Sequence, residues 1–159
     1  MSDSAVAAGL DVAVSPGPQW VVFACGGRHF AVPLERVREI LTPQPFTRLP
    51  GCGPEVCGLA GVRGRVVTTF DLGVVLAGRA SVDHPDHRLL LVERAERLVG
   101  AAVDEVVAVA SASVQSFEAG EPIIEGMPVR SEEAIGSGVI EKRSFVVVDI
   151  DAILRRLLA

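Results

Sequence analysis

Apolar runs joined by very short turns are the feature of this sequence that most constrains its fold. Three such runs are WVVFACGGRHFAVPL (20–34), RLLLVERAERLVGAAV (88–103) and IGSGVIEKRSFVVVDI (135–150). They turn at Gly26-Gly27, at Arg94–Arg97 and near Glu141-Lys142, and a fourth turn at Arg63–Arg65 precedes the strand-like run Val66–Phe70. Two apolar runs separated by a short turn are typical of a β-hairpin. The chain is therefore predicted to be mainly β.

The same order of elements occurs twice along the chain. The stretch Trp20–Val37 aligns with Leu89–Val106, and GVRGRVVTTFDLGVVL at 61–76 resembles GVIEKRSFVVVDIDAIL further on. Each half reads as a hairpin, an acid, a second hairpin, another acid and a short helix. An internal duplication into two small barrels is the prediction, because closing a sheet removes its free strand edges.

Short helices are expected at Leu34–Leu41, Leu72–Leu76 and Ile150–Leu158, the last with its apolar residues on one face. Asp71 and Asp149 each precede one of these helices. An aspartate at a helix start accepts hydrogen bonds from free backbone N–H groups, so both are predicted to be helix caps. Loops rich in Pro and Gly are expected at 42–54, 78–86 and 115–122.

Composition excludes several classes of protein. Apolar residues make up 49% of the chain and aromatic residues only 4%, which indicates an aliphatic core. The net charge of −5 argues against a general nucleic-acid binder. No apolar run is long enough to span a membrane, and residues 1–18 read as a disordered leader rather than a secretory signal. Three cysteines without a CxxC pair suggest free thiols, so a cytoplasmic location is expected.

Catalytic motifs are weak in this sequence. The stretch GCGPEVCG matches neither a phosphate-binding loop nor a dinucleotide fingerprint, and no nucleophile with its base is evident. The densest set of potential metal ligands is Asp83–His87, in the Pro-rich link between the halves. We therefore predict no enzyme activity, no cofactor and no metal. A small metal-binding protein or enzyme that uses Asp83–His87 is the alternative from another class.

Four motifs, in order and at matching spacing, identify a family. They are FAVPLERVREI (30–40), VCGLAGVRGRVVTTFDL (56–72), LVGAAVDEV (98–106) and SFVVVDIDAIL (144–154). In these stretches the chain resembles the CheW-like family of bacterial chemotaxis coupling proteins, from about residue 19 to 158. The resemblance implies two five-stranded, SH3-like β-barrel subdomains with short helices and a C-terminal helix. It also implies a non-catalytic adaptor between the cytoplasmic tip of a chemoreceptor and the regulatory domain of the histidine kinase CheA.

Six residues are the candidate partner contacts: Val37, Glu39, Gly58, Arg63, Val106 and Val109. Arg63 is the predicted anchor, because arginine is enriched at the energetic centres of interfaces. Glu39 is expected to pair with Arg63 or to border an apolar groove. Val37, Val106 and Val109 are compatible with simple core packing. Two of them, Val37 and Val106, occupy equivalent repeat positions, so a groove shared by the two halves is the alternative.

Two departures from the family pattern lie near this surface. Gly61 stands where the family usually has asparagine, and Thr68 stands where it usually has proline. These departures leave open the alternative that this protein is a divergent homologue, which binds receptors or another CheW-like protein but not the kinase. We expect the domain to cover 19–159, with subdomains of about 19–88 and 89–159. The sequence does not decide whether these two halves are sequential or interleaved in space.

Overall fold

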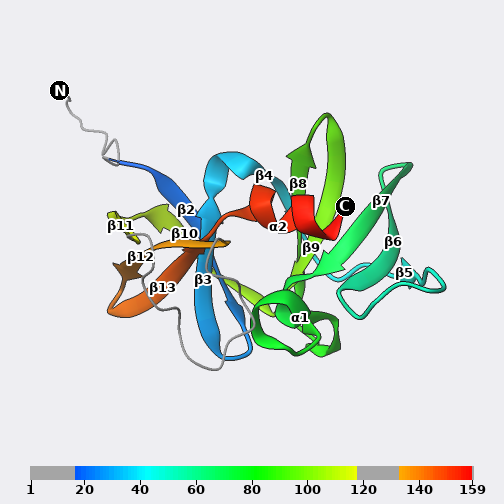
Figure 1. Cartoon of the computed structure of the whole chain (residues 1–159), viewed down its shortest axis with the longest axis horizontal. Coiled ribbons are helices and arrows are strands. Elements are labelled where there is room, and N and C mark those ends of the chain that lie inside the picture. The colour runs from blue at the N-terminus through cyan, green and yellow to red at the C-terminus, as the bar shows by residue number, and fades with distance from the viewer. Residues whose placement is uncertain (1–16, 118–132, 159) are drawn as a thin grey trace.

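The computed structural model describes residues 17–117 and 133–158, and they form two β-sheets with short helices (Figure 1). The strands are β2 (Gln19–Cys25), β3 (Arg28–Pro33), β4 (Val37–Leu41), β5 (Phe46–Thr47), β6 (Val56–Val62), β7 (Arg65–Asp71), β8 (Arg88–Arg94), β9 (Arg97–Val103), β10 (Glu105–Ser111), β11 (Val114–Ser116), β12 (Ala134–Ile140) and β13 (Arg143–Val148). The helices are α1 (Leu72–Ala77) and α2 (Ile150–Leu157), with 3-10 turns η1 (Leu34–Arg36) and η2 (Ser81–Asp83). The predicted leader spans residues 1–18, and residues 1–16 of it lie outside the described residues.

The two sheets have matching strand orders. The first sheet runs β10-β2-β3-β13-β12-β11, and the second runs β4-β8-β9-β7-β6-β5. In both, one parallel pair (β13 with β3, β7 with β9) lies among antiparallel pairs. This correspondence follows the internal repeat, in which β2–β3 aligns with β8–β9. The mainly β, two-subdomain fold is confirmed, but each sheet has six strands rather than five, and hydrogen bonds between the described strands do not close either sheet into a barrel.

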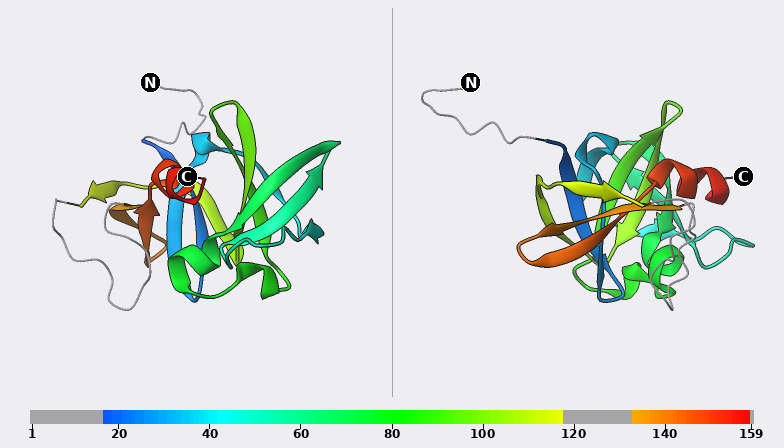
Figure 2. Two further views of the ribbon diagram at one scale, coloured as in Figure 1. Left: turned by 45° about the vertical axis from the view of Figure 1, so that its right-hand side comes forward. Right: turned by 60° about the vertical axis from the view of Figure 1, so that its left-hand side comes forward.

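The sheets are interleaved along the chain. After β3 the chain crosses to place β4 on the second sheet, and after β9 it crosses back to place β10 on the first. The predicted boundary near residue 88 therefore falls inside the segment that builds the second sheet. Segments far apart in sequence, such as β2 and β10, lie side by side as a result (Figure 2).

Both faces of the inner strands are buried, which explains why they read as continuous apolar runs. In β2, Val21 and Phe23 point into a central core that residues of both sheets share, whereas Trp20 and Val22 point into a small core of the first sheet. In β8 the same alternation sends Leu90 to the central core. The second sheet has two small cores of its own, the first with Ala60, Leu89 and Ala102 and the second with Val62, Val67 and Leu91.

The predicted helix caps are confirmed. Asp71 accepts a hydrogen bond from Val74 N at 3.2 Å, and Asp149 accepts one from Ala152 N at 3.1 Å. The predicted helix at 34–41 is wrong. Only η1 is helical there, and the rest forms β4, because it pairs with the free edge of β8.

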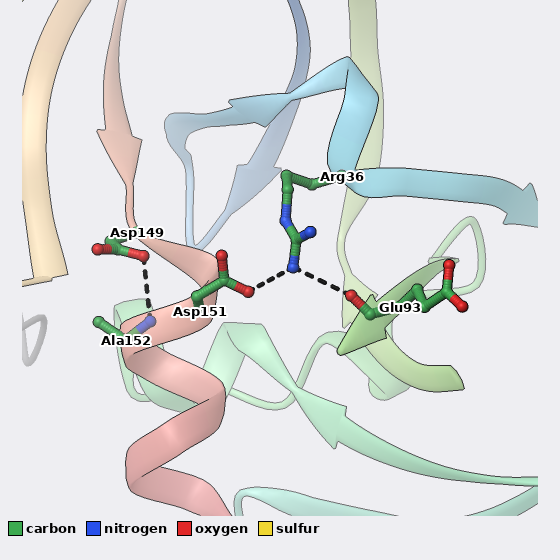
Figure 3. A network of polar contacts seen from close by, with 5 residues as sticks. All are labelled: Arg36, Glu93, Asp149, Asp151 and Ala152. Atoms are coloured by element: carbon green, nitrogen blue, oxygen red, sulfur yellow. Dashed lines mark hydrogen bonds and ion pairs between the residues drawn. The ribbon is translucent and has the colours of Figure 1, made fainter. Parts of the chain in front are cut away.

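Polar contacts between distant segments join the two halves. The guanidinium of Arg36, in η1, contacts the carboxylate of Asp151 in α2 and donates to the Glu93 carbonyl of β8 at 3.0 Å (Figure 3). On another side, Asp104 accepts from Gly26 N at 2.9 Å and from the Ser81 hydroxyl at 2.7 Å. These contacts hold the β2–β3 turn of the first sheet, and the helix α2 that follows β13 of the same sheet, against segments next to the second sheet.

Candidate partner-binding surface

Arg63 is presented at the tip of the β6–β7 hairpin. Arg63 and Gly64 form its two-residue turn, with φ of 50° and 78°. A turn with both φ values positive matches the right-handed twist of the flanking strands, and Gly64 adopts it without strain. The Arg63 side chain is 71% exposed. The local sequence thus holds a guanidinium outward on a short, well-defined turn.

Glu39 and Arg63 form an ion pair across the end of the second sheet. Both terminal nitrogens of Arg63 donate to the two carboxylate oxygens of Glu39, so the pairing that the sequence suggested is present. The hydrogen bonds from Arg63 lower the pKa of the Glu39 carboxyl, and Glu39 in turn raises the pKa of Arg63. Three strands separate β4 from β6 in the sheet order, so this contact requires the sheet to curl strongly.

A hollow of about 360 Å³ lies beside this ion pair. It is lined by Arg38, Glu39, Val62, Arg63, Arg65, Leu91 and Leu98. Val62 and Leu91 are buried members of the second small core, so the hollow is the mouth of that core. An apolar floor with a polar rim is the usual composition of a protein interface. The equivalent position of Glu39 in the first sheet is Ala108, which cannot form such a pair.

The three candidate valines lie in two different environments. Val37 in β4 and Val106 in β10 hold equivalent positions, each beside a register shift in its ladder. Both are partly buried and pack against the central core. Val109 differs, because this residue of β10 is 48% exposed. Val106 and Val109 belong to the first sheet, whereas Glu39 and Arg63 belong to the second, so the candidates do not form one continuous strand face.

Gly58 has a backbone role. Its φ is +133°, and a Cβ atom there would lie 2.3 Å from the Thr47 carbonyl oxygen. The register of β6 shifts at this point, between Val56 and Gly58. A glycine is therefore required where β6 passes close to the end of β5, and its contribution to a partner surface is indirect.

Asp71 makes more contacts than a helix cap needs. Besides Val74 N, its buried carboxylate accepts from Ser81 N at 2.9 Å and Val82 N at 3.2 Å. Burial raises the pKa of Asp71, although the backbone hydrogen bonds act in the opposite direction. The sequence predicted the cap but not these bonds, since no local pattern shows that the chain after α1 folds back onto it.

The cysteines are free within the described residues. Burial raises the pKa of the Cys25 thiol to about 12, and burial together with Asp71 raises that of Cys57 to about 12. Both thiols are therefore protonated at neutral pH. Reactive cysteines are thiolates, so neither environment favours nucleophilic chemistry.

The Asp83–His87 cluster is dispersed in the structure. His87 is buried and its Nδ1 lies 2.8 Å from the His84 carbonyl oxygen, whereas Asp83 and His84 border a different, open hollow. In residues 17–117 and 133–158, no three His, Cys, Asp or Glu side chains are arranged to hold a metal ion. Among the same residues, no helix has the length and apolarity to cross a membrane.

Comparison with known proteins agrees with this architecture. Residues 19–158 match the family model described as CheW-like domain. Protein PilI of Pseudomonas aeruginosa is 34% identical over 122 residues, which cover 76% of this chain and 68% of that protein. Chemotaxis protein CheW of Bacillus subtilis is 27% identical over 150 residues, 89% of each chain. The crystal structure of scaffolding protein TtCheW from Thermoanaerobacter tengcongensis superposes with a TM-score of 0.70 and 19% identity, covering 84% of this chain and 89% of that one. With the two matched sheets and the repeat described above, these findings show that the chain belongs to the CheW-like family.

Proposed function

We propose that this protein is a non-catalytic cytoplasmic adaptor that couples a chemoreceptor signalling tip to a CheA-like histidine kinase. Family membership and the relatives named as chemotaxis proteins support a role as a scaffold in chemotaxis-type signalling. The observation that carries the proposal is the Glu39–Arg63 pair beside an apolar-floored hollow, because a polar rim around an apolar floor is the usual composition of a protein interface.

Each candidate residue has a distinct part in the proposal. Arg63 is the anchor for the kinase regulatory domain, and Glu39 holds its guanidinium in place until a partner carboxylate replaces or joins it. The exposed Val109 contacts the receptor helix hairpin directly, and the partly buried Val37 and Val106 contribute the parts of their side chains that the central core leaves accessible. Gly58 keeps β6 and β5 in the arrangement that places the Arg63 turn. Other CheW-like proteins are further possible partners of the same surfaces.

Replacing Arg63 with alanine is expected to weaken kinase binding without unfolding the protein. An exposed ion pair contributes little to stability, whereas truncating a central interface arginine typically costs more than about 2 kcal/mol, or roughly 30-fold in affinity. The measurement is calorimetric titration of purified Arg63→Ala with the kinase regulatory domain and, separately, with a receptor signalling-tip fragment.

The matched control is Lys142→Ala. Lys142 is exposed and has φ of 67° in the turn of the β12–β13 hairpin, the equivalent of the Arg63 turn in the first sheet. We expect this variant to bind both partners as the wild type does. If the wild-type protein bound the receptor fragment but not the kinase domain, the result would instead favour the alternative of a divergent homologue without kinase coupling. Tight binding of both partners by Arg63→Ala would remove Arg63 from the interface.

A further inference from the structure

A second hollow, of about 390 Å³, opens where the β6–β7 and β8–β9 hairpins separate. It lies between the first residues of β7 and β9, beside the C-terminal end of α2. Figures 1 and 2 show the two hairpins diverging beyond this point. We call it the arginine hollow, after a lining that includes Arg65, Val66, Arg94, Arg97, Leu98 and Leu158.

The charge of the arginine hollow is not neutralised by the protein itself. Arg36, Arg38, Arg63 and Arg156 each form an ion pair, but none of the ion pairs among the described residues involves Arg65, Arg94 or Arg97. Glu96 is the one acidic residue in the lining. In a chain with net charge −5, a concave site with three guanidinium groups and one carboxylate is suited to an anionic ligand.

The β8–β9 hairpin carries this charge at a cost to its own stability. Arg94 and Arg97 are directly opposite each other in the ladder, and like charges in that arrangement repel. The turn between them, Ala95-Glu96, has φ of 50° and 65°, whereas the equivalent turn of the first sheet uses Gly26 and Gly27. A bound carboxylate would relieve the repulsion between the two arginines.

The backbone at the arginine hollow offers hydrogen bonds to an extended chain. The parallel ladder between β7 and β9 begins only at Thr68 and Val99. Before that point, residues 65–67 pair with β6 and residues 97–98 pair with β8, each on the side away from the hollow. The facing strand edges therefore have no strand partner among the described residues, and an added strand uses such edges.

The geometry points to an extended acidic peptide segment of a partner protein as the ligand of the arginine hollow. Its carboxylates pair with Arg65, Arg94 and Arg97, and its main chain bonds to the diverging edges of β7 and β9. Val66 and Leu158, which are 72% and 41% exposed, accept an apolar side chain. None of the lining residues is aromatic, so the site has no surface on which a nucleotide base stacks. This inference goes beyond the proposed function, since it does not use the Glu39–Arg63 pair.

A labelled peptide of alternating glutamate and valine, EVEVE, tests the proposal by fluorescence anisotropy with the full-length protein. We expect Arg94→Gln/Arg97→Gln to weaken its binding by about tenfold or more, because charge-assisted hydrogen bonds are lost. The matched control is Arg28→Gln/Arg143→Gln, which changes the positions in the first sheet equivalent to Arg97 and Arg65. That control is expected to change affinity by less than about twofold.

Two further probes separate the peptide site from other outcomes. A QVQVQ peptide is expected to bind at least about tenfold more weakly than EVEVE, and N-methylation of alternate EVEVE amides is expected to weaken binding similarly. Equal binding of QVQVQ, an unchanged affinity in Arg94→Gln/Arg97→Gln, or an N-methylated peptide that binds normally would overturn the proposal. Displacement of EVEVE by a lower concentration of inorganic phosphate would also overturn it, in favour of a phosphate site. Receptor and kinase fragments are absent from this assay, so its failure is distinct from failure of the adaptor function.

Discussion

Cutting the chain between residues 88 and 89 is expected to give two fragments that do not fold separately. The fragment 19–88 contains β2 and β3 but lacks β10 and β13, the strands that flank them in the first sheet. It would also expose the stacked rings of Phe23 and Phe30, which are fully buried in the intact chain. An isolated hairpin with both apolar faces exposed is not stable in water. Circular dichroism melting and amide dispersion in NMR spectra measure the result for each fragment.

The intact chain is the control for this experiment. Because both sheets contribute to one central core, we expect it to unfold in a single cooperative transition, as small domains with one core usually do. A cooperative melt of the 19–88 fragment by itself would contradict the interleaved arrangement. It would instead support two sequential subdomains.

Replacing Arg156 with alanine is expected to destabilise the protein by about 3–5 kcal/mol, the range for breaking a buried ion pair. Arg156 in α2 donates to both carboxylate oxygens of Glu133, at 2.7 and 2.8 Å. The Glu133 side chain is only 2% exposed, so removal of the guanidinium leaves a desolvated carboxylate without its charge partner. Urea denaturation of the variant and the wild type measures the difference in free energy of unfolding.

The preceding residue of α2 provides the control for this prediction. Arg155 is exposed, so Arg155→Ala is expected to change the free energy of unfolding by no more than about 0.5 kcal/mol. Glu133→Gln/Arg156→Ala should recover part of the loss, because the neutral amide is less costly to bury than a carboxylate. Equal, small effects of Arg155→Ala and Arg156→Ala would show that the Glu133 ion pair does not hold α2 in place.

Local features of the fold were predictable because the signals that encode them are local. The hairpin turns at Gly26-Gly27, Arg63-Gly64 and Glu141-Lys142 lie where the sequence placed them, since a two-residue turn depends on the residues beside it. The caps at Asp71 and Asp149 follow from one side chain and the N–H three residues later. The same local reasoning failed at 37–41, where pairing with β8 outweighs an apolar spacing that also suits a helix.

The interleaving of the sheets could not be read from the sequence. The repeat shows that β2–β3 resembles β8–β9, but it does not show that β4 and β10 each cross to the opposite sheet. The contacts that join the halves, such as Arg36 with Asp151 and Asp104 with Gly26, connect residues too far apart for any spacing rule.

The candidate site was predictable only in part, because its residues come from segments that meet only in the folded chain. Pairing with Arg63 is one of the two roles that the sequence leaves open for Glu39, and the structure brings these two side chains together. The sequence did not separate Val109, on an exposed position, from Val37 and Val106, which pack on the central core. The arginine hollow could not be predicted from the sequence, because Arg65 and the Arg94–Arg97 turn come from different hairpins and meet only in the folded second sheet.

Recruitment of the kinase domain to an immobilised receptor signalling-tip fragment tests the adaptor role most directly. The kinase regulatory domain is passed over the receptor surface alone, then with this protein, and then with Arg63→Ala. The adaptor account predicts that the kinase domain is retained only when this protein is present, and that Arg63→Ala remains on the receptor but retains little kinase. Two results would contradict the account. One is that the kinase domain is retained to the same level with and without this protein. The other is that the receptor holds this protein but the kinase domain is still not retained.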